Sequence, residues 1–287
     1  MKQLPSLPIA LTIAGSDSGG GAGLQADLKT FAALGVHGAS VVTCLTAQNP
    51  KEVSRVQATE PSMVRAQLQA VFAELPPRAV KTGMLYSAEI IAEVARFWGT
   101  RTQPPLVVDP VMVATSGARL LEPEAIRLLR TRLLPRATLL TPNLDEAAAL
   151  TGLELREPED LREAARLLAH EYGCAVLVKG GHLSGLDSAV DVLRVKKMEW
   201  VLTAPFVRGV STHGTGCTYS AAITAYLARG LDLPQAVTAA KTFITQAIAR
   251  SQSIGGHTVL NYFWNLRPPP RPRPRSKPPS PLRAVRG

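Results

Sequence analysis

The chain has 287 residues, of which 46% are hydrophobic and 19% are charged, a balance that excludes a disordered protein. This length suffices for one large α/β domain or two small ones. No apolar run approaches the roughly 18 residues that a membrane span needs, so we expect no membrane association. The apolar stretch near the N-terminus is short and interrupted by Pro5 and Pro8, and it predicts a buried first strand rather than a signal peptide.

The net charge of +10 is concentrated at the C-terminal end. Residues 267–287 contain seven basic residues, eight prolines and no acid, which leaves +3 (ten less seven) for the rest of the chain. Proline forbids helix and central strand, so we expect one domain over 1–266 followed by a disordered tail over 267–287. The tail could contact a polyanion or simply be solvated. Because it has no aromatic residues or groove-fitting structure, nucleic-acid recognition is not expected.

The three cysteines, Cys44, Cys174 and Cys217, are too few and too scattered for a disulfide framework. Their odd number fits a reducing compartment, which predicts a cytoplasmic protein. No histidine is spaced from another histidine or from a cysteine as zinc ligands are, so a structural zinc site is not expected.

Short apolar runs alternate with amphipathic runs along the chain, which predicts a parallel sheet covered by helices on both faces. The expected strands are 9–14, 40–45, 79–81, 106–108, 138–140, 175–178 and 191–195. The expected helices are one whose face carries Leu24, Leu28, Phe31 and Leu34, and then 62–73, 88–97, 123–133, 158–171, 215–228 and 234–250. In such a sheet, ligands bind at the carboxyl ends of the strands.

The first strand is followed by the glycine-rich stretch GSDSGGGAG, 15–23, which we expect to be a loop. Its glycines would let a ligand approach the backbone in front of a helix. No Gly-Lys dipeptide occurs, which excludes a P-loop, and a flexible turn remains an alternative. Asp27 in the following helix would favour the positive helix end.

Polar side chains also follow later strands. TAQN, 46–49, is expected to be a loop in which Gln48 offers a donor and an acceptor to a heteroaromatic ring, or caps the loop. Asp109 follows the strand at 106–108. Asn143 and Glu146 follow the strand at 138–140, where they fit an Mg²⁺ site next to phosphates or a helix capping box. Lys179 ends another strand and could meet a phosphate or be solvated.

STHGTGCTYSAA, 211–222, leads into a predicted helix. Free N–H groups and the positive helix end converge here, which predicts an anion hole for a phosphoryl group. Its residues are Thr212, Gly214, Thr215, Gly216 and Cys217. Because a helix N-terminus lowers a thiol pKa, we expect a Cys217 thiolate near neutral pH that could act as a base. Packing in the core is the alternative for a cysteine.

The chain resembles the ribokinase-like superfamily, and more narrowly the hydroxymethylpyrimidine/phosphomethylpyrimidine kinases of thiamin biosynthesis. The resemblance covers about residues 9 to 250. It is carried by TIAGSDSGGGAGLQADLKTF, TAQN, VKTGML, VVDPVMVATSG, TPNLDEA, VLVKGGH and STHGTGCTYSAAI, in this order. It implies a three-layer α/β/α fold with a mainly parallel central sheet. The implied activity is phosphorylation of 4-amino-5-hydroxymethyl-2-methylpyrimidine and then of its monophosphate, with ATP as co-substrate and Mg²⁺ as cofactor.

The resemblance also implies roles for individual residues. The substrate would be bound by Gln48, Asp27, Ala22, Met84 and Val111; ATP by Asn143, Lys179 and Thr212; and Mg²⁺ by Asp109 and Glu146. Gly214, Thr215 and Gly216 would form the anion hole, and Cys217 would be the base where broader relatives carry aspartate. A homodimer is implied as well. Two alternatives remain: a pyridoxal or pyridoxine kinase on the same frame, and a non-catalytic pyrimidine-binding regulator.

Overall fold

The computed structural model of the chain describes residues 6–99, 103–112, 121–181, 183, 187–210 and 213–265. The predicted tail over 267–287 lies outside the described residues, as does Thr212 of the predicted anion hole. In the described part of the chain, no helix is both long and apolar enough to cross a membrane.

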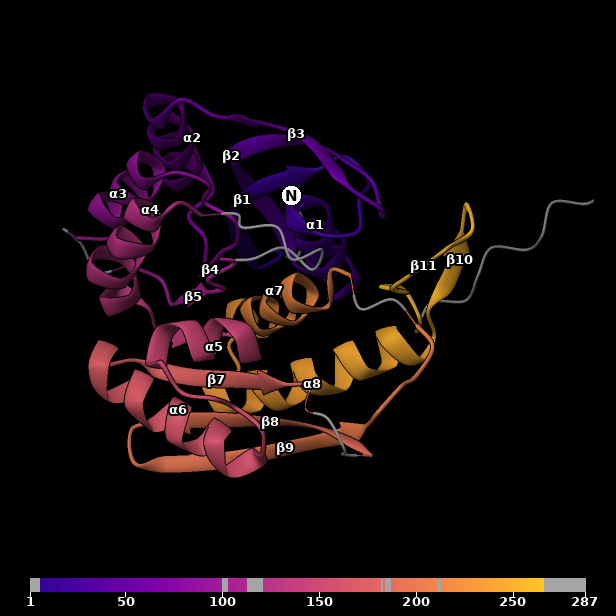
Figure 1. Ribbon diagram of the computed structural model, residues 1–287. Helices are drawn as coiled ribbons and strands as arrows, with labels where there is room; N and C mark the ends of the chain where they lie inside the picture. Colours follow the sequence, from indigo (N-terminus) through magenta and orange to yellow (C-terminus); the bar gives the residue numbers. More distant parts are fainter. Residues whose placement is uncertain are drawn as a thin grey trace, which may run out of the picture.

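Among the described residues, nine strands form one sheet in the order β3-β2-β1-β4-β5-β6-β7-β8-β9 (Figure 1). The strands are β1 (Ile9–Asp17), β2 (His37–Gln48), β3 (Val53–Ala58), β4 (Ala79–Thr82), β5 (Leu106–Val108), β6 (Leu139–Leu140), β7 (Ala175–Gly180), β8 (Ser188–Val195) and β9 (Met198–Pro205). In this order, the six strands β2, β1, β4, β5, β6 and β7 pair in parallel with their neighbours. The antiparallel strands are β3 at one side and β8 and β9 at the other. The predicted mainly parallel sheet is confirmed.

Helices cover both faces of this sheet. They are α1 (Gly23–Ala33), α2 (Pro61–Glu74), α3 (Ala88–Phe97), α4 (Pro123–Leu128), α5 (Leu144–Thr151), α6 (Pro158–Tyr172), α7 (Thr215–Ala228) and α8 (Leu233–Ala249). One core cluster joins the sheet to α2 through α6, and two others join its opposite face to α1, α7 and α8. The predicted α/β/α layering is therefore confirmed. A small hairpin, β10 (Gln252–Ile254) and β11 (His257–Val259), projects beyond α8 (Figure 1).

Two predicted loops are wrong, because their first residues continue strands. β1 extends through Asp17 and pairs with β2 up to Thr46, so the glycine-rich loop proper begins after Asp17. Gln48 is the last residue of β2 rather than part of a loop, and it pairs with Val53 of β3. Tertiary pairing overrides local glycine and polar composition here, since each strand finds a neighbour for its backbone.

Sequence patterns also missed two strands of the sheet, both strands of the β10–β11 hairpin, and one helix. β3 and β9 lie at the two edges of the sheet and expose much of their surface, so they lack the apolar runs used to find buried strands. α5 has only eight residues, and its signal was the capping box at Asn143 and Glu146. The predicted helix over 123–133 is α4 followed by a π-helical turn, Leu129–Leu133.

Thr82 provides a stability test of the sheet core. Its side chain is fully buried, and its hydroxyl has no hydrogen-bond partner among the described residues. We expect Thr82→Val to raise the free energy of unfolding by about 1 kcal/mol, because it removes an unsatisfied buried hydroxyl at nearly constant volume. Thermal or urea unfolding would measure this.

The matched control is Thr12, on neighbouring β1, which is equally buried but donates its hydroxyl to Asp27 Oδ2 at 2.6 Å. Thr12→Val should lower stability by about 1–3 kcal/mol, since it leaves a buried carboxylate short of a donor. Equal effects of the two substitutions would contradict the role assigned to hydrogen bonding.

Candidate active site

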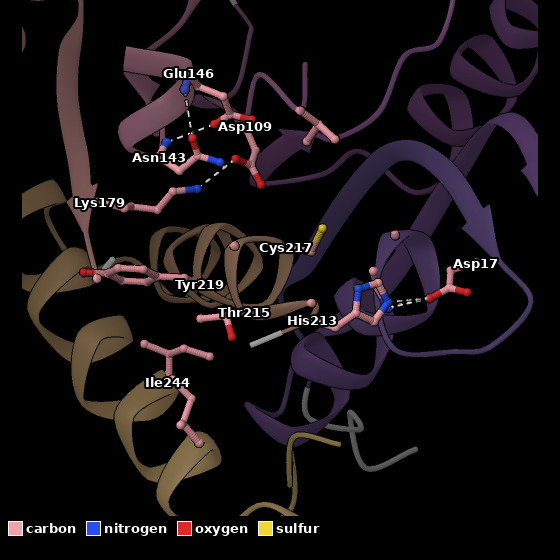
Figure 2. Close-up of a pocket in the computed structure, with 18 of the residues that line it drawn as sticks. Asp17, Asp109, Asn143, Glu146, Lys179, His213, Thr215, Cys217, Tyr219 and Ile244 are labelled. Atoms are coloured by element: carbon pink, nitrogen blue, oxygen red, sulfur yellow. Dashed lines mark hydrogen bonds and ion pairs between the residues drawn. The ribbon is translucent and has the colours of Figure 1, made fainter. Parts of the chain in front are cut away.

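A cavity of about 290 Å³ runs along the carboxyl ends of the parallel strands, where the sequence predicted it. Most of the predicted site residues line it: Ala22, Gln48, Met84, Asp109, Val111, Asn143, Glu146, Lys179, Gly214, Thr215, Gly216 and Cys217. They come from segments spread over some 200 residues, and the sheet brings them together because its strands are parallel. Figure 2 shows Asp109 and Glu146, the start of α7 at Thr215 and Cys217, and His213 around this cavity.

Asp17 organises the glycine-rich loop. Its carboxylate accepts the N–H groups of Gly19 at 2.8 Å, Gly21 at 3.0 Å and Ala22 at 2.8 Å. Its Oδ2 also lies 3.4 Å from His213 Nε2, on the segment before α7. Burial raises the pKa of Asp17, but the hydrogen bonds from His213, Ala22 and Gly19 bring it below its ordinary value. These N–H groups of the loop are therefore already bonded to Asp17, which disfavours a phosphate-binding role for them. Ala22 contributes to the pocket wall.

Asp109 and Lys179 form the charged centre of the pocket. Lys179 Nζ lies 3.0 Å from Asp109 Oδ1, and both side chains are nearly buried. Ser220 of α7 donates to Asp109 Oδ2 at 3.1 Å, which ties the carboxylate to the helix. The alternative of a solvated Lys179 is therefore wrong, since its ammonium group points into the pocket (Figure 2).

Asn143 and Glu146 form a capping box at the start of α5 and also line the pocket. Asn143 Oδ1 accepts the Glu146 N–H at 2.9 Å, and Glu146 Oε2 accepts the Asn143 N–H at 2.9 Å. Burial raises the pKa of Glu146 to about 7; Lys179 opposes the shift and Asp109 adds to it. The two interpretations of the N-x-x-E pattern are thus compatible, because the cap is what fixes the carboxylate beside Asp109.

The N-terminus of α7 faces this charged centre. Gly214 is the N-cap residue with φ 80°, and its carbonyl accepts the first helical hydrogen bond, from Thr218 N. The N–H groups of Thr215, Gly216 and Cys217 precede that first donor, so the helix itself does not use them. A Cβ on Gly216 would lie 3.4 Å from Lys179 Nζ. This geometry forms the donor array that the sequence predicted as an anion hole.

The expected Cys217 thiolate is wrong for this structure. Burial raises the pKa of the Cys217 thiol to about 11, although the Lys81 cation lowers it. The helix end was the signal in the sequence, but desolvation outweighs it, although Cys217 is only half-buried and lines the pocket. At neutral pH Cys217 is therefore a neutral thiol in the first turn of α7.

Asp27 lies behind the pocket rather than on its wall. Its carboxylate is fully buried, and it accepts Lys81 Nζ at 2.8 and 2.9 Å and the Thr12 hydroxyl at 2.6 Å. It occupies the fifth position of α1, so it does not cap the helix end either. Asp27 was predicted to bind the substrate, but the structure gives it a lysine as its direct partner.

The structure adds pocket residues that sequence patterns did not identify. One end is formed by α7, α8 and the β8–β9 pair, and includes Tyr219, Ile244 and Phe206. Within it, Lys241 Nζ lies 2.7 Å from Asp191 Oδ2. The sequence signal for this pair was that Lys241 lies on the apolar face of the predicted 234–250 helix, where a lysine needs a buried partner.

Parallel strands between two helical layers, with a helix N-terminus aimed at a lysine-paired aspartate, define the class as a small-molecule kinase of the ribokinase-like fold. The match to the family model described as phosphomethylpyrimidine kinase covers residues 17–261. The chain belongs to this family of phosphotransferases.

Individual relatives agree. The hydroxymethylpyrimidine/phosphomethylpyrimidine kinase of Synechococcus elongatus is 48% identical over 264 residues, 91% of this chain and 99% of that protein. The phosphomethylpyrimidine kinase structure from Clostridium difficile has a TM-score of 0.75 and 44% identity, covering 84% of this chain and 99% of that one. An ADP complex of Bacillus subtilis pyridoxal kinase has a TM-score of 0.83 and 39% identity, covering 90% and 98%.

Proposed function

We propose that the protein transfers phosphate from ATP to 4-amino-5-hydroxymethyl-2-methylpyrimidine and then phosphorylates the monophosphate to the diphosphate, as its relatives' names indicate. The observation that carries the proposal is one continuous pocket that holds Gln48, the Asp109–Lys179 pair and the N-terminus of α7. These are the parts that an in-line transfer needs: a ring-binding edge, charge neutralisation and preorganised donors.

The chemistry of the donors supports an Mg²⁺ site at Asp109 and Glu146. Among the described residues, no group of three His, Cys, Asp or Glu side chains could hold a metal alone. Mg²⁺ normally needs only one or two carboxylates, with water and substrate phosphates completing its shell. Asp109 and Glu146 both line the pocket, and the charge of Asp109 raises the pKa of Glu146, an effect that a bound cation would oppose. When bound, the ion neutralises charge on the phosphates.

For the nucleotide, we propose that Lys179, Asn143 and Thr212 bind its phosphates. The end of the pocket between α7, α8 and β9 would take the nucleoside. Its apolar side chains, such as Phe206 and Ile244, suit a flat base.

For the pyrimidine, we propose the opposite end of the pocket. Gln48 ends β2 there, beside Ala22, Met84 and Val111. Val111 has a φ of 39°, which is strained for a β-branched residue, and such strain is typical of functional positions. Asp27 would support this wall from behind, through its contacts with Lys81 and Thr12.

We propose that Cys217 accepts the proton of the substrate hydroxyl through its minor thiolate form. In a loose transition state the nucleophile loses its proton late, so most of the rate comes from positioning and from the donors of Thr215, Gly216 and Cys217. The thiol lines the pocket next to these donors. A scarce thiolate therefore limits the rate without preventing it.

A pyridoxal kinase is the second candidate, favoured by the similarity to the B. subtilis pyridoxal kinase structure. Both substrates are heteroaromatic rings with a hydroxymethyl group. We expect the purified full-length chain, incubated with ATP and Mg²⁺, to convert the hydroxymethylpyrimidine to monophosphate and then diphosphate, as followed by chromatography. Faster turnover of pyridoxal without any pyrimidine diphosphate would contradict the first proposal, and no turnover of either alcohol would favour the non-catalytic alternative.

We propose a cytoplasmic homodimer. The three cysteines, Cys44, Cys174 and Cys217, are all free, which suits a reducing compartment. The dimer rests on the family resemblance, and sedimentation of the purified chain would test it.

A further inference from the structure

A buried ion pair behind the pocket wall touches none of the groups that take part in the proposed phosphate transfer. Lys81 and Asp27 are both fully buried and are joined by contacts of 2.8 and 2.9 Å. Removing two charges from water is costly, and a fully buried pair adds little stability over an apolar one. The position of the pair therefore needs another explanation.

The register of the sheet places this pair beneath Cys217. Thr12 of β1 lies directly opposite Lys81 of β4, and two residues earlier Ala10 lies opposite Ala79. Ala10 and Ala79 lie in one core cluster with Ala221 of α7. Since side chains two apart in a strand share a face, Thr12 and Lys81 face the same helix nearer the carboxyl end of the sheet.

Two of the helices on that face, α7 and α1, place the thiol near this pair. Cys217 precedes Ala221 by one turn of α7, so it lies above the stretch of sheet that carries Lys81. Its sulfur accepts the N–H of Gly23, and Asp27 lies one turn further along α1. A Cβ on Gly83, a residue of the pocket wall, would lie 3.1 Å from Lys81 Nζ. Only a thin wall separates the ammonium group from the pocket.

Charged and titratable groups face the thiol from every element around it. They are Lys81 of β4, Asp27 of α1, Asp109 after β5, Lys179 of β7 and Tyr262 near the C-terminal end of the described chain. Lys179 is already engaged by Asp109 at 3.0 Å. Burial lowers the pKa of Lys81, but the neighbouring carboxylates, chiefly Asp27, raise it by more than burial lowers it. The lysine therefore stays charged. Lys81 is thus the cation for which the thiolate and Asp27 compete.

We propose that Asp27 keeps Cys217 protonated in the resting enzyme by holding the Lys81 cation that would otherwise stabilise the thiolate. Asp27 and Lys81 are then positioning residues: neither lines the pocket, and both act on the reaction only through the protonation state of Cys217. With Asp27 ionised, forming the thiolate gives the three groups a net charge of −1. With a neutral residue at 27, a thiolate and the lysine would balance each other.

The test is the pH dependence of Cys217 alkylation by iodoacetamide in the full-length chain, with the modified cysteine identified by mass spectrometry. Asp27→Asn should lower the thiol pKa. If the shift is about 2 units, roughly 100-fold more thiolate would be offset by about tenfold lower nucleophilicity, so alkylation at pH 7.5 should be about tenfold faster. Lys81→Met should slow it about tenfold or more, and the double variant should lie between the two.

Glu93→Gln is the matched control, because Glu93 is a nearly buried carboxylate paired with Arg65 and Arg96 on the other side of the sheet. It should leave Cys217 alkylation unchanged. If Asp27→Asn alkylates at the wild-type rate or more slowly, the proposal is overturned. Should that variant fail to fold, Thr12→Val decides, since it weakens the ionised form of Asp27 and should speed alkylation severalfold; an unchanged rate would overturn the proposal.

This inference deepens the proposed function, because it rests on Cys217 being the base. Alkylation needs no turnover, so the two can fail separately. A reactive thiol in Asp27→Asn together with an inactive wild-type protein would overturn only the kinase. An active kinase with unaltered alkylation in both single variants would overturn only the charge pair.

Discussion

Cys217→Ala is expected to lower kcat by about 10² or more, because it removes the group that we propose as acceptor of the hydroxyl proton. The pH dependence makes the prediction specific. With a thiol pKa of about 11, the active thiolate is the minor form throughout the neutral range. Its population, and with it kcat, should rise about tenfold per pH unit between pH 7 and 9, as long as proton transfer limits the rate.

The sign follows from the protonation step. A raised pKa leaves the base protonated at low pH, so the wild-type rate increases with pH, whereas Cys217→Ala should lose that increase. Initial rates with saturating ATP and pyrimidine, measured from pH 6.5 to 9, would show both effects. A variant with near-normal kcat and an unchanged pH profile would remove the base role from Cys217 and leave the kinase assignment intact.

Gly214→Ala is expected to lower kcat by about 10² to 10³, the effect of losing one preorganised donor at a site of developing charge. Gly214 has a φ of 80°, and a Cβ there would lie 1.9 Å from the carbonyl oxygen of Gly21. Since that oxygen belongs to the loop held by Asp17, neither side can give way easily. The start of α7 would shift, and its N–H groups would no longer converge.

Gly173→Ala separates this effect from backbone strain. Gly173 ends α6 with a similar φ of 68°, but a Cβ there would meet nothing within 4 Å. It should lose about 1–2 kcal/mol of unfolding free energy and keep its kcat. Thermal unfolding and initial rates of both variants would be compared. If Gly214→Ala matches Gly173→Ala in both measurements, the geometry at the start of α7 does not support catalysis.

The sequence predicted the layers of the fold and most of the pocket, because these follow from local information. Buried parallel strands appear as apolar runs, and the carboxyl ends of parallel strands meet at one edge whatever their order. Strand-end position alone therefore predicts that Asp109, Asn143 and Lys179 lie close together. The antiparallel edge strands β3 and β9 escaped prediction, because exposed edges carry little hydrophobic pattern.

The electrostatic state of the site could not be predicted in the same way. Burial and partners far apart in the sequence set the charge of Cys217, the pairing of Asp27 with Lys81 and that of Asp191 with Lys241. A helix N-terminus favours a thiolate, but desolvation and a neighbouring carboxylate reverse the outcome.

The sequence by itself therefore determined the family, the fold and most of the residues that meet at the pocket, since these depend on residue type and order. The tertiary structure alone decided which of those residues reach the cavity and which are charged there. The reason is physical: the energy of a charge depends on its distance to other charges and on its access to water, and neither is fixed until the chain has folded.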